Sequence, residues 1–325
     1  MKTIPGSGNW LLTCRREEGG GVTLLQAETW DSRAVLPQTI AGQPVTGIGD
    51  HAFAPGRPAP AEGERFRITC GPVSGEPDNT GMTELIVPET VESVGDYALY
   101  NCAGLKTLEV FDRARRWGGS VLMNCRRLDT FRLHLSEERS PLLSYFAGEL
   151  SRELDISVVY PDQSRLRLIF PEYVESYEES CPAHHFLYNI FGAGYPYHSC
   201  FRDRAFFPAD FDALWPDFLR TEHDPGCALR MAWWRLRLPR GLDPEAENRY
   251  LGYLRDHAGQ ALSWLLDQRD MPGISWLLEA VRPEKAVLEA GCEQARRQNL
   301  PEAQALLLEQ LHRRFPAGRE KRFDL

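Results

Sequence analysis

The chain has 325 residues, which exceeds the size at which one hydrophobic core usually stops growing, so two domains or an elongated repeat array are expected. Its 42% hydrophobic and 26% charged residues exclude wholesale disorder. The formal net charge of −9 argues against a nucleic-acid-coating protein, because such binding needs clustered lysines and arginines. No apolar run approaches the roughly 18 residues of a membrane span, so we expect no membrane insertion.

The N-terminal residues carry no apolar stretch of signal-peptide length, and RREE at 15–18 stands where a cleavage region would fall. We therefore expect a cytoplasmic protein. Its eight cysteines contain no C-x-x-C pair and no zinc-ribbon spacing, so in a reducing compartment most should be buried thiols. If a leader had been removed, the even number of cysteines would permit disulfides.

A repeat organises the first half of the chain. LYNCAGLKTLEV at 99–110 aligns with LMNCRRLDTFRL at 122–133 at an offset of 23. Each copy carries the L-x-x-L-x-L pattern of a leucine-rich-repeat strand, in which alternate side chains point inward. The in-register series are Met82, Leu105 and Leu128; Leu85, Leu108 and Phe131; and Val87, Val110 and Leu133, with Leu154 and Ile156 continuing the last two.

Asn101-Cys102 and Asn124-Cys125 occupy the corresponding corners of two copies. A polar side chain there can satisfy turn backbone groups, and a small thiol can pack inside. Burial in apolar surroundings raises the pKa of a thiol and suppresses the thiolate. The pattern therefore predicts an architectural role for both cysteines.

The stretch LIVPETVESVGDYALYNCAGLKTLEV, Leu85–Val110, resembles the BspA-like class of bacterial leucine-rich repeats, and 34–53 resembles the first repeat of such arrays. The resemblance covers about residues 22–160 and implies a β solenoid, with 1–21 as an N-terminal cap. Two departures stand out: residues 54–81 interrupt the array, and Trp117-Gly118-Gly119 replaces the I-G-x-x-A-F corner of the third copy.

Such a solenoid exposes a sheet whose outward positions lie between the leucines. This mixed polar surface suits protein recognition, although for any single residue a merely solvated role is an equal alternative. The candidate protein-binding residues are Glu84, Ile86, Thr107, Glu109, Thr130 and Arg132.

Residues 161–225 lose the 23-residue register. SRLRLIFPEY at 164–173 predicts a last edge strand that caps the solenoid and is stopped by Pro171. The following stretch, 184–218, is dense in aromatic residues and glycine, and is the place where a small-molecule site would lie.

An alternative junction site in that stretch consists of His185, Tyr195, His198 and Cys200. Together with His184, these residues invite a zinc hypothesis. Adjacent histidines seldom ligate one ion, however, and H-x-C is not a usual chelating unit, so packing and surface roles are favoured. We expect no metal and no cofactor.

Residues 226–316 show helical periodicity with breaks at proline and glycine, which predicts antiparallel helix hairpins. Leu277-Leu278 and Leu306-Leu307, offset by 29, resemble two copies of a degenerate ankyrin-type helix pair, although the T-P-L-H-x-A signature is missing. Residues 317–325 form a basic tail, for which a frayed, solvated terminus is favoured.

These patterns together predict an α+β protein: a BspA-like leucine-rich-repeat solenoid followed by a helical-hairpin repeat domain. No catalytic motif is found, so we expect a non-enzymatic, cytoplasmic scaffold that binds another protein through the sheet face or the groove between its halves. One alternative is an enzyme or a small-molecule or metal-binding protein with its site in 180–220. A second is a cell-surface adhesion protein.

Overall fold

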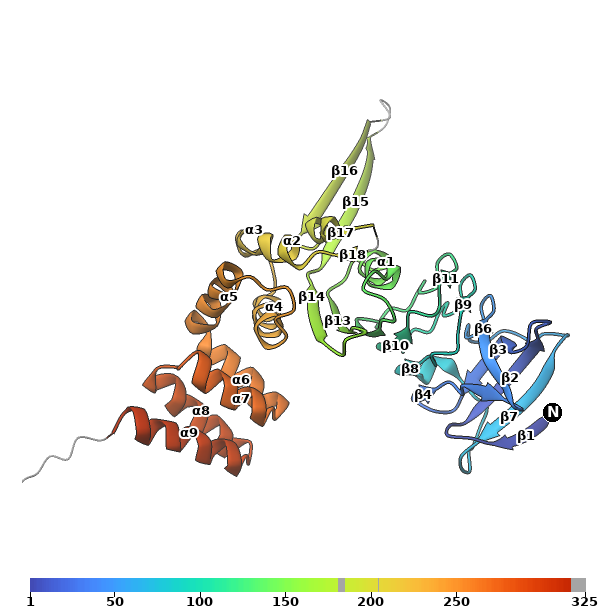
Figure 1. Cartoon of the computed structure of the whole chain (residues 1–325), viewed down its shortest axis with the longest axis horizontal. Helices are drawn as coiled ribbons and strands as arrows, with labels where there is room; N and C mark the ends of the chain where they lie inside the picture. The colour runs from blue at the N-terminus through green and yellow to red at the C-terminus, as the bar shows by residue number, and fades with distance from the viewer. Residues whose placement is uncertain (181–184, 204, 317–325) are drawn as a thin grey trace, which may run out of the picture. The chain divides into compact units, whose positions relative to one another are not determined.

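The computed structural model of the chain describes residues 1–180, 185–203 and 205–316. The chain is a mixed α+β protein that divides into two compact units, Met1–His223 and Asp224–Leu325, and each is described by itself (Figure 1). The basic tail expected at 317–325 lies outside the described residues.

An eight-stranded mixed sheet begins the N-terminal unit. In spatial order its described strands are β1 (Lys2–Pro5), β7 (Glu64–Thr69), β2 (Trp10–Arg16), β3 (Val22–Thr29), β6 (Gln43–Ile48), β9 (Ser93–Val94) and β11 (Arg116–Trp117), with β5 (Thr39–Ile40) paired to β6. The expected cap, 1–21, supplies β1 and β2. The expected interruption, 54–81, supplies β7, which pairs with both of them, so this insertion is an integral part of the sheet.

A second, six-stranded sheet carries the predicted repeat strands. Its order is β14 (Arg165–Phe170), β13 (Leu154–Val159), β12 (Thr130–His134), β10 (Thr107–Phe111), β8 (Glu84–Ile86) and β4 (Arg33–Val35). Neighbours from β4 to β13 are parallel, and β14 pairs antiparallel to β13 at the edge of the sheet. The edge strand predicted around Leu166, Leu168 and Phe170 is therefore confirmed.

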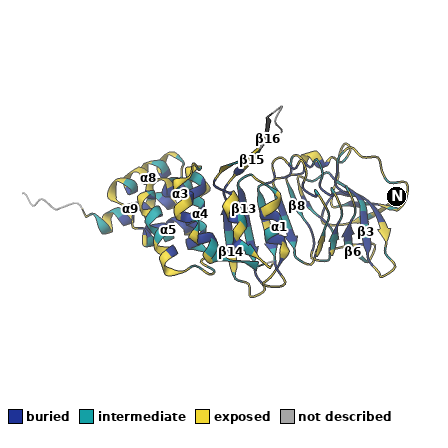
Figure 2. Ribbon diagram, turned by 90° about the horizontal axis from the view of Figure 1, so that it is seen from above, coloured by how far each residue is buried: buried dark blue, intermediate teal, exposed yellow. Residues whose placement is uncertain are grey.

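One buried row of side chains crosses this sheet, one from each strand. Backbone pairing places Leu108 beside both Leu85 and Phe131, so the 23-residue register of these three residues is confirmed. Each member of the row is at most 1% exposed. Figure 2 shows dark blue, buried segments on strands of this sheet such as β13. Full burial of the leucine, isoleucine and phenylalanine side chains in this row contributes about 1.5–3 kcal/mol each. The row consists of Ala34, Leu85, Leu108, Phe131, Ile156 and Leu168.

The expected continuation of the register into β13 is wrong by two residues. Phe131 pairs with Ile156, an offset of 25, whereas the 23-residue period places Leu154 there. The cause is helix α1 (Pro141–Glu149), which is inserted between β12 and β13 and stacks Phe146 on Phe131 at 4.6 Å between ring centroids. Because side chains alternate with a period of two along a strand, a shift of two keeps the same side chains inward.

Buried polar corners stack along the array. Cys102 and Cys125 lie 23 residues apart, and Asn79 stands one further period upstream. The Sγ atoms of Cys102 and Cys125 donate to the carbonyls of Phe53 (3.4 Å) and Leu99 (3.1 Å). Asn79 Nδ2 donates to the same Phe53 carbonyl at 2.8 Å. The repeat therefore reaches into the stretch 54–81 that the sequence marks as an interruption.

The third copy keeps its glycine corner, contrary to the sequence expectation. Strand β11 pairs parallel with β9, so Trp117 lies beside Val94 and Gly118 takes the place of Gly95. The amide of Gly118 donates to the Val94 carbonyl, just as the amide of Gly95 donates to the Ile48 carbonyl, both at 2.8 Å. Adjacent chain segments leave no room for a Cβ at either glycine.

The N-terminal unit ends in a series of short elements. Tyr173 is buried at the start of an antiparallel hairpin, and the rest of the hairpin pairs with no other strand among the described residues (Figure 1). The elements are β15 (Tyr173–Ser180), β16 (His185–Gly192), η2 (Tyr195–Cys200), β17 (Phe201–Arg202), β18 (Ala205–Phe206), α2 (Pro208–Ala213) and α3 (Trp215–Arg220). The short helix η1 (Asn79–Gly81) lies earlier in the unit, between β7 and β8.

The C-terminal unit is helical throughout its described residues. Its helices are α4 (Pro225–Arg237), α5 (Pro244–Asp256), α6 (Ala258–Gln268), α7 (Met271–Ala280), α8 (Lys285–Arg297) and α9 (Pro301–Arg314). Successive helices pack as α6 on α7 and α8 on α9, and equivalent helices of the two pairs also pack, α6 on α8 and α7 on α9. No helix in the described ranges is both long enough and apolar enough to span a bilayer.

The two helix pairs repeat at 30 residues, which corrects the expected offset of 29. Arg269 and Asn299 both end a helix with positive φ, at 55° and 60°. In each case the amide of the next residue donates to a carbonyl of the preceding helix: Asp270 N–H to the Leu265 carbonyl, and Leu300 N–H to the Ala295 carbonyl. Buried Leu277 consequently corresponds to Leu307.

Replacement of Gly118 by alanine is expected to destabilise the N-terminal unit by about 1–3 kcal/mol, because the new Cβ would lie 2.4 Å from the amide nitrogen of Asp96. Gly119→Ala is the matched control, since its Cβ meets nothing closer than 4.0 Å, and its effect should stay within about 0.5 kcal/mol. Urea unfolding measures both. Equal stability of the two variants would contradict the assigned glycine corner.

Candidate functional site

The outer sheet face is the candidate site. We define it as the side chains of β4, β8, β10, β12 and β13 that point away from the buried row. Pairing aligns Thr107 with Glu84 and Thr130, and Glu109 with Ile86 and Arg132. All six residues predicted from the sequence thus lie on adjacent strands in one continuous surface.

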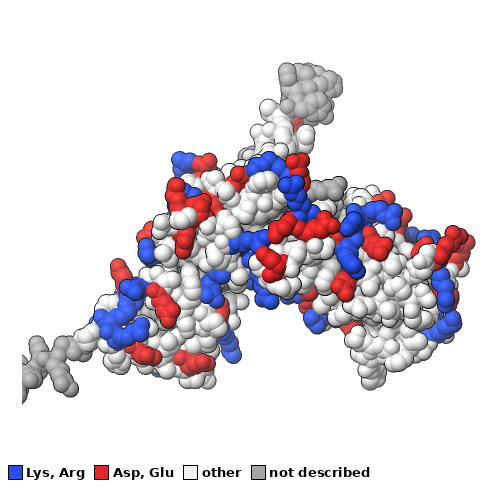
Figure 3. Space-filling view, in the orientation of Figure 1, with Lys and Arg blue, Asp and Glu red and all other residues white. Residues whose placement is uncertain are grey.

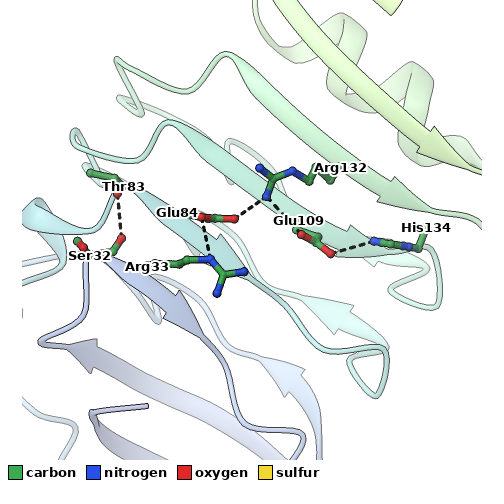
Figure 4. Close-up of polar contacts among 7 residues, drawn as sticks. All are labelled: Ser32, Arg33, Thr83, Glu84, Glu109, Arg132 and His134. Atoms are coloured by element: carbon green, nitrogen blue, oxygen red, sulfur yellow. Dashed lines mark hydrogen bonds and ion pairs between the residues drawn. The ribbon is translucent and has the colours of Figure 1, made fainter. Parts of the chain in front are cut away.

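Ion pairs link these side chains across four strands (Figure 4). Arg33 Nε donates to Glu84 Oε2 at 3.1 Å, and the other oxygen of Glu84 accepts from Arg132. Arg132 also reaches Glu109 Oε2 at 3.4 Å, and the second oxygen of Glu109 lies 2.9 Å from His134 Nε2. Each carboxylate therefore bridges two basic side chains.

Two residues of this network, Arg33 and His134, are absent from the sequence-based set. His134 lies one alternation beyond Arg132 on β12 and stacks on Phe111 at 4.4 Å between ring centroids. Arg33 lies on β4, which pairs with β8 from far away in the sequence. Extending the outward alternation by one step along β10 and β12 predicts that Phe111 and His134 also face outward. Predicting the position of Arg33 requires knowing that the first repeat pairs with β8.

At the far end of the face, Arg167 of β14 extends the pattern. Its Nε donates to Asp155 Oδ1 at 2.7 Å, and its Nη2 donates to the other oxygen of the same carboxylate. This fork geometry is the one that best matches guanidinium to carboxylate. Charged side chains consequently continue from β4 to β14.

The network contributes modestly to stability. Arg132 and Arg33 are largely exposed, and exposed ion pairs contribute about 0–1 kcal/mol each. The hydrogen bond from His134, together with the nearby Arg132, lowers the pKa of the Glu109 carboxyl. The buried row supplies the packing energy, so the charged side chains above it can take part in binding without unfolding the sheet.

The residues of the alternative junction site are only partly brought together. Tyr195 and His198 stack at 5.4 Å between ring centroids, and both meet Tyr173 edge-on. Burial lowers the pKa of His198. Cys200 is fully buried, which raises the pKa of its thiol to about 12 and disfavours the nucleophilic thiolate. His185 begins β16, and both its side chain and the whole of His184 lie outside what the structure describes.

The corner cysteines are poor nucleophiles for the same reason. Burial raises the pKa of Cys125 to about 12, and it also raises the pKa of Cys102 well above its ordinary value. Among the described residues, no group of three or more His, Cys, Asp or Glu side chains is placed to hold a metal ion.

No protein-family model matches the chain, and no curated protein matches it in sequence. It is similar in part to the crystal structure of a leucine rich cell surface protein from Faecalibacterium prausnitzii A2-165, with 18% sequence identity and a TM-score of 0.27. The match covers 46% of this chain and 41% of that protein's chain.

The Glu109 network predicts a pH dependence of stability. Because the pKa of Glu109 is lowered on folding, its stabilisation is present above the ordinary carboxyl value of 4.5 and is lost as the pH falls through the folded value. Glu109→Gln should therefore cost up to about 1 kcal/mol near neutral pH and less at strongly acidic pH. Urea unfolding at both pH values checks this, with the exposed Glu89→Gln as control. A larger cost at acidic pH would contradict the network.

Thiol accessibility gives a separate check on the array. Cys70 is exposed, whereas Cys14, Cys102, Cys125 and Cys200 are buried. Iodoacetamide at neutral pH should label Cys70 in the folded protein at least about tenfold faster than those four, which should react only after urea is added. Peptide mapping by mass spectrometry measures the extent at each site. Rapid native labelling of Cys102 or Cys125 would show that the corners are open.

Proposed function

We propose that this protein is a non-enzymatic interaction module that binds another protein through its outer sheet face. The observation that carries the proposal is the alignment of outward side chains from successive parallel strands into one charged surface joined by shared ion pairs. A regular array of both charge signs on a rigid sheet suits recognition of a protein surface with complementary charges.

The architecture we propose is a BspA-like leucine-rich-repeat solenoid followed by stacked ankyrin-like helix pairs. The in-register pairing of Leu85, Leu108 and Phe131 supports the first part. The packing of α6 on α8 and of α7 on α9 supports the second. Both architectures stack repeats that contact mainly their neighbours, and both present extended surfaces to partners.

We further propose the cytoplasm as the place of action. The thiols of Cys102 and Cys125 each donate a hydrogen bond to a buried carbonyl, a role that requires the reduced form. Reducing compartments keep such thiols intact.

The proposal is tested by placing a bulky charge on the outer sheet face. Thr107→Arg projects a guanidinium between the aligned strands, whereas Met123→Arg places the same group at an exposed turn position, 48% exposed, as the matched control. Partners recovered from the source organism with the unaltered protein should be lost about tenfold or more with the first variant and retained with the second. Quantitative mass spectrometry of the captured proteins provides the measurement.

Two results would contradict the proposed function. One is the recovery of the same partners by Thr107→Arg, which would place binding elsewhere. The other is a turnover activity in the purified protein that disappears when Tyr195 or His198 is replaced.

A further inference from the structure

Most of the large apolar side chains that the structure leaves exposed lie on the hairpin of β15 and β16. Val174, Leu187 and Phe191 are 52%, 55% and 58% exposed, and Tyr177 and Tyr188 are also exposed. Val174, Leu187 and Phe191 lie on one face of the hairpin, and Tyr177 and Tyr188 lie on the other. Single exposed apolar residues are ordinary, but several on one element mark an interaction surface.

The two faces of the hairpin differ in the contacts that their side chains make within the hairpin. Tyr177 lies opposite Tyr188, with ring centroids 4.8 Å apart, and Tyr188 hydrogen-bonds to the carboxylate of Glu175. These residues share one face. On the other face, which we call the open face, Val174 lies opposite Phe191 and Glu178 lies opposite Leu187, with the polar pair of Ser176 and Asn189 between them.

A partner packed on the hairpin would stabilise it. A two-stranded hairpin without a third strand or a helix packed on it is marginally stable in water. Here Tyr173 anchors the base, through its amide to the Ser151 carbonyl and its ring against Tyr195 and His198. Beyond Tyr173, the open-face side chains Val174, Leu187 and Phe191 remain more than half exposed.

The charge of the hairpin restricts what can cover it. The sequence between Arg167 and Arg202 has no lysine or arginine, and its four glutamates are Glu172, Glu175, Glu178 and Glu179. The described hairpin shows no blue on the side seen in Figure 3. Nucleic acids and anionic membranes would be repelled, because their surfaces carry phosphates. A second copy of the hairpin would bring two sets of glutamates together, and like charges across an interface are unfavourable.

We propose that the open face of the hairpin, formed by Val174, Glu178, Leu187 and Phe191, is a second docking surface that binds a basic amphipathic protein segment. Aliphatic side chains of the segment cover Leu187 and Phe191, while lysine or arginine pairs with Glu178. Unlike the outer sheet face, this surface combines exposed apolar area with charge of one sign. The apolar area contributes affinity for the partner segment, and the charge orients it.

The experiment measures peptide binding to the full chain by fluorescence anisotropy. The probe is a labelled synthetic peptide of repeated Leu-Lys-Val-Arg units, and its counterpart has glutamate in place of the basic residues. The unaltered protein should bind the basic peptide at least about tenfold more tightly than the acidic one, and the affinity should fall as salt is added. Leu187→Ser combined with Phe191→Ser should weaken binding about tenfold or more.

Matched variants separate the docking surface from general effects. Leu308→Ser replaces another exposed leucine, on α9, and should leave binding unchanged. Glu178→Arg keeps the apolar side chains and should reduce the preference for the basic peptide, with Glu172, Glu175 and Glu179 still present, whereas Glu279→Arg on the exposed side of α7 should leave the preference unchanged. Because Glu178→Arg removes no apolar contact, it tests the docking surface even if the serine variants disorder the hairpin.

Four outcomes would overturn the inference. Equal binding of the two peptides, or binding that survives both Leu187→Ser and Phe191→Ser, would remove the docking role. Dimerisation in sedimentation that is lost in those variants would identify a second copy as the occupant. Binding to phosphatidylserine vesicles would identify a membrane. None of these results bears on Thr107→Arg, so the sheet-face proposal stands or falls separately.

Discussion

The row of apolar side chains through Leu85, Leu108, Phe131 and Ile156 is the constraint on which the N-terminal unit depends. Parallel backbone pairing fixes each residue beside its equivalent in the next strand, and full burial makes any slip by one residue costly, because the whole strand would then point its polar side chains inward. The same constraint acts at the corners, where Asn79, Cys102 and Cys125 each find a buried carbonyl. The buried row and the corners therefore fix the positions of the side chains on the outer sheet face.

The two surfaces of the N-terminal unit have different physical characters. The outer sheet face is rigid, carries both charge signs and satisfies its charges internally through pairs such as Glu84 with Arg132. The open face of the hairpin is apolar, carries charge of one sign and has little packed beneath it. A sheet with satisfied ion pairs favours selectivity over strength, since a partner must offer better pairs than those already present. An exposed apolar strand pair supplies affinity but discriminates less.

Much of the repeat could be predicted because its signal is local and periodic. The spacing of 23 places Leu85, Leu108 and Phe131 correctly, and the alternation within each strand identifies the six outward residues. The failures have identifiable causes. The α1 insertion changed one coil length, the turn at Asn299 set a helix-pair offset of 30, and Arg33 depends on a pairing distant in sequence. The hairpin escaped notice since its aromatic residues are equally compatible with a core, and exposure is visible only in three dimensions.

Helix α1 also has a meaning for how such arrays change in length. The coil that contains it is longer than its neighbours by an even number, two, and the apolar side chains of β13 still face inward. An odd increment is accommodated as well: the spacing from Ala34 to Ile48 exceeds the equivalent spacing from Leu85 to Val94 by five residues, and Ile48 still pairs with Val94 with both side chains buried. Loops between the strands of this protein therefore absorb length changes of either parity, and a duplicated or grafted coil must preserve the alternation within its strands rather than the exact period.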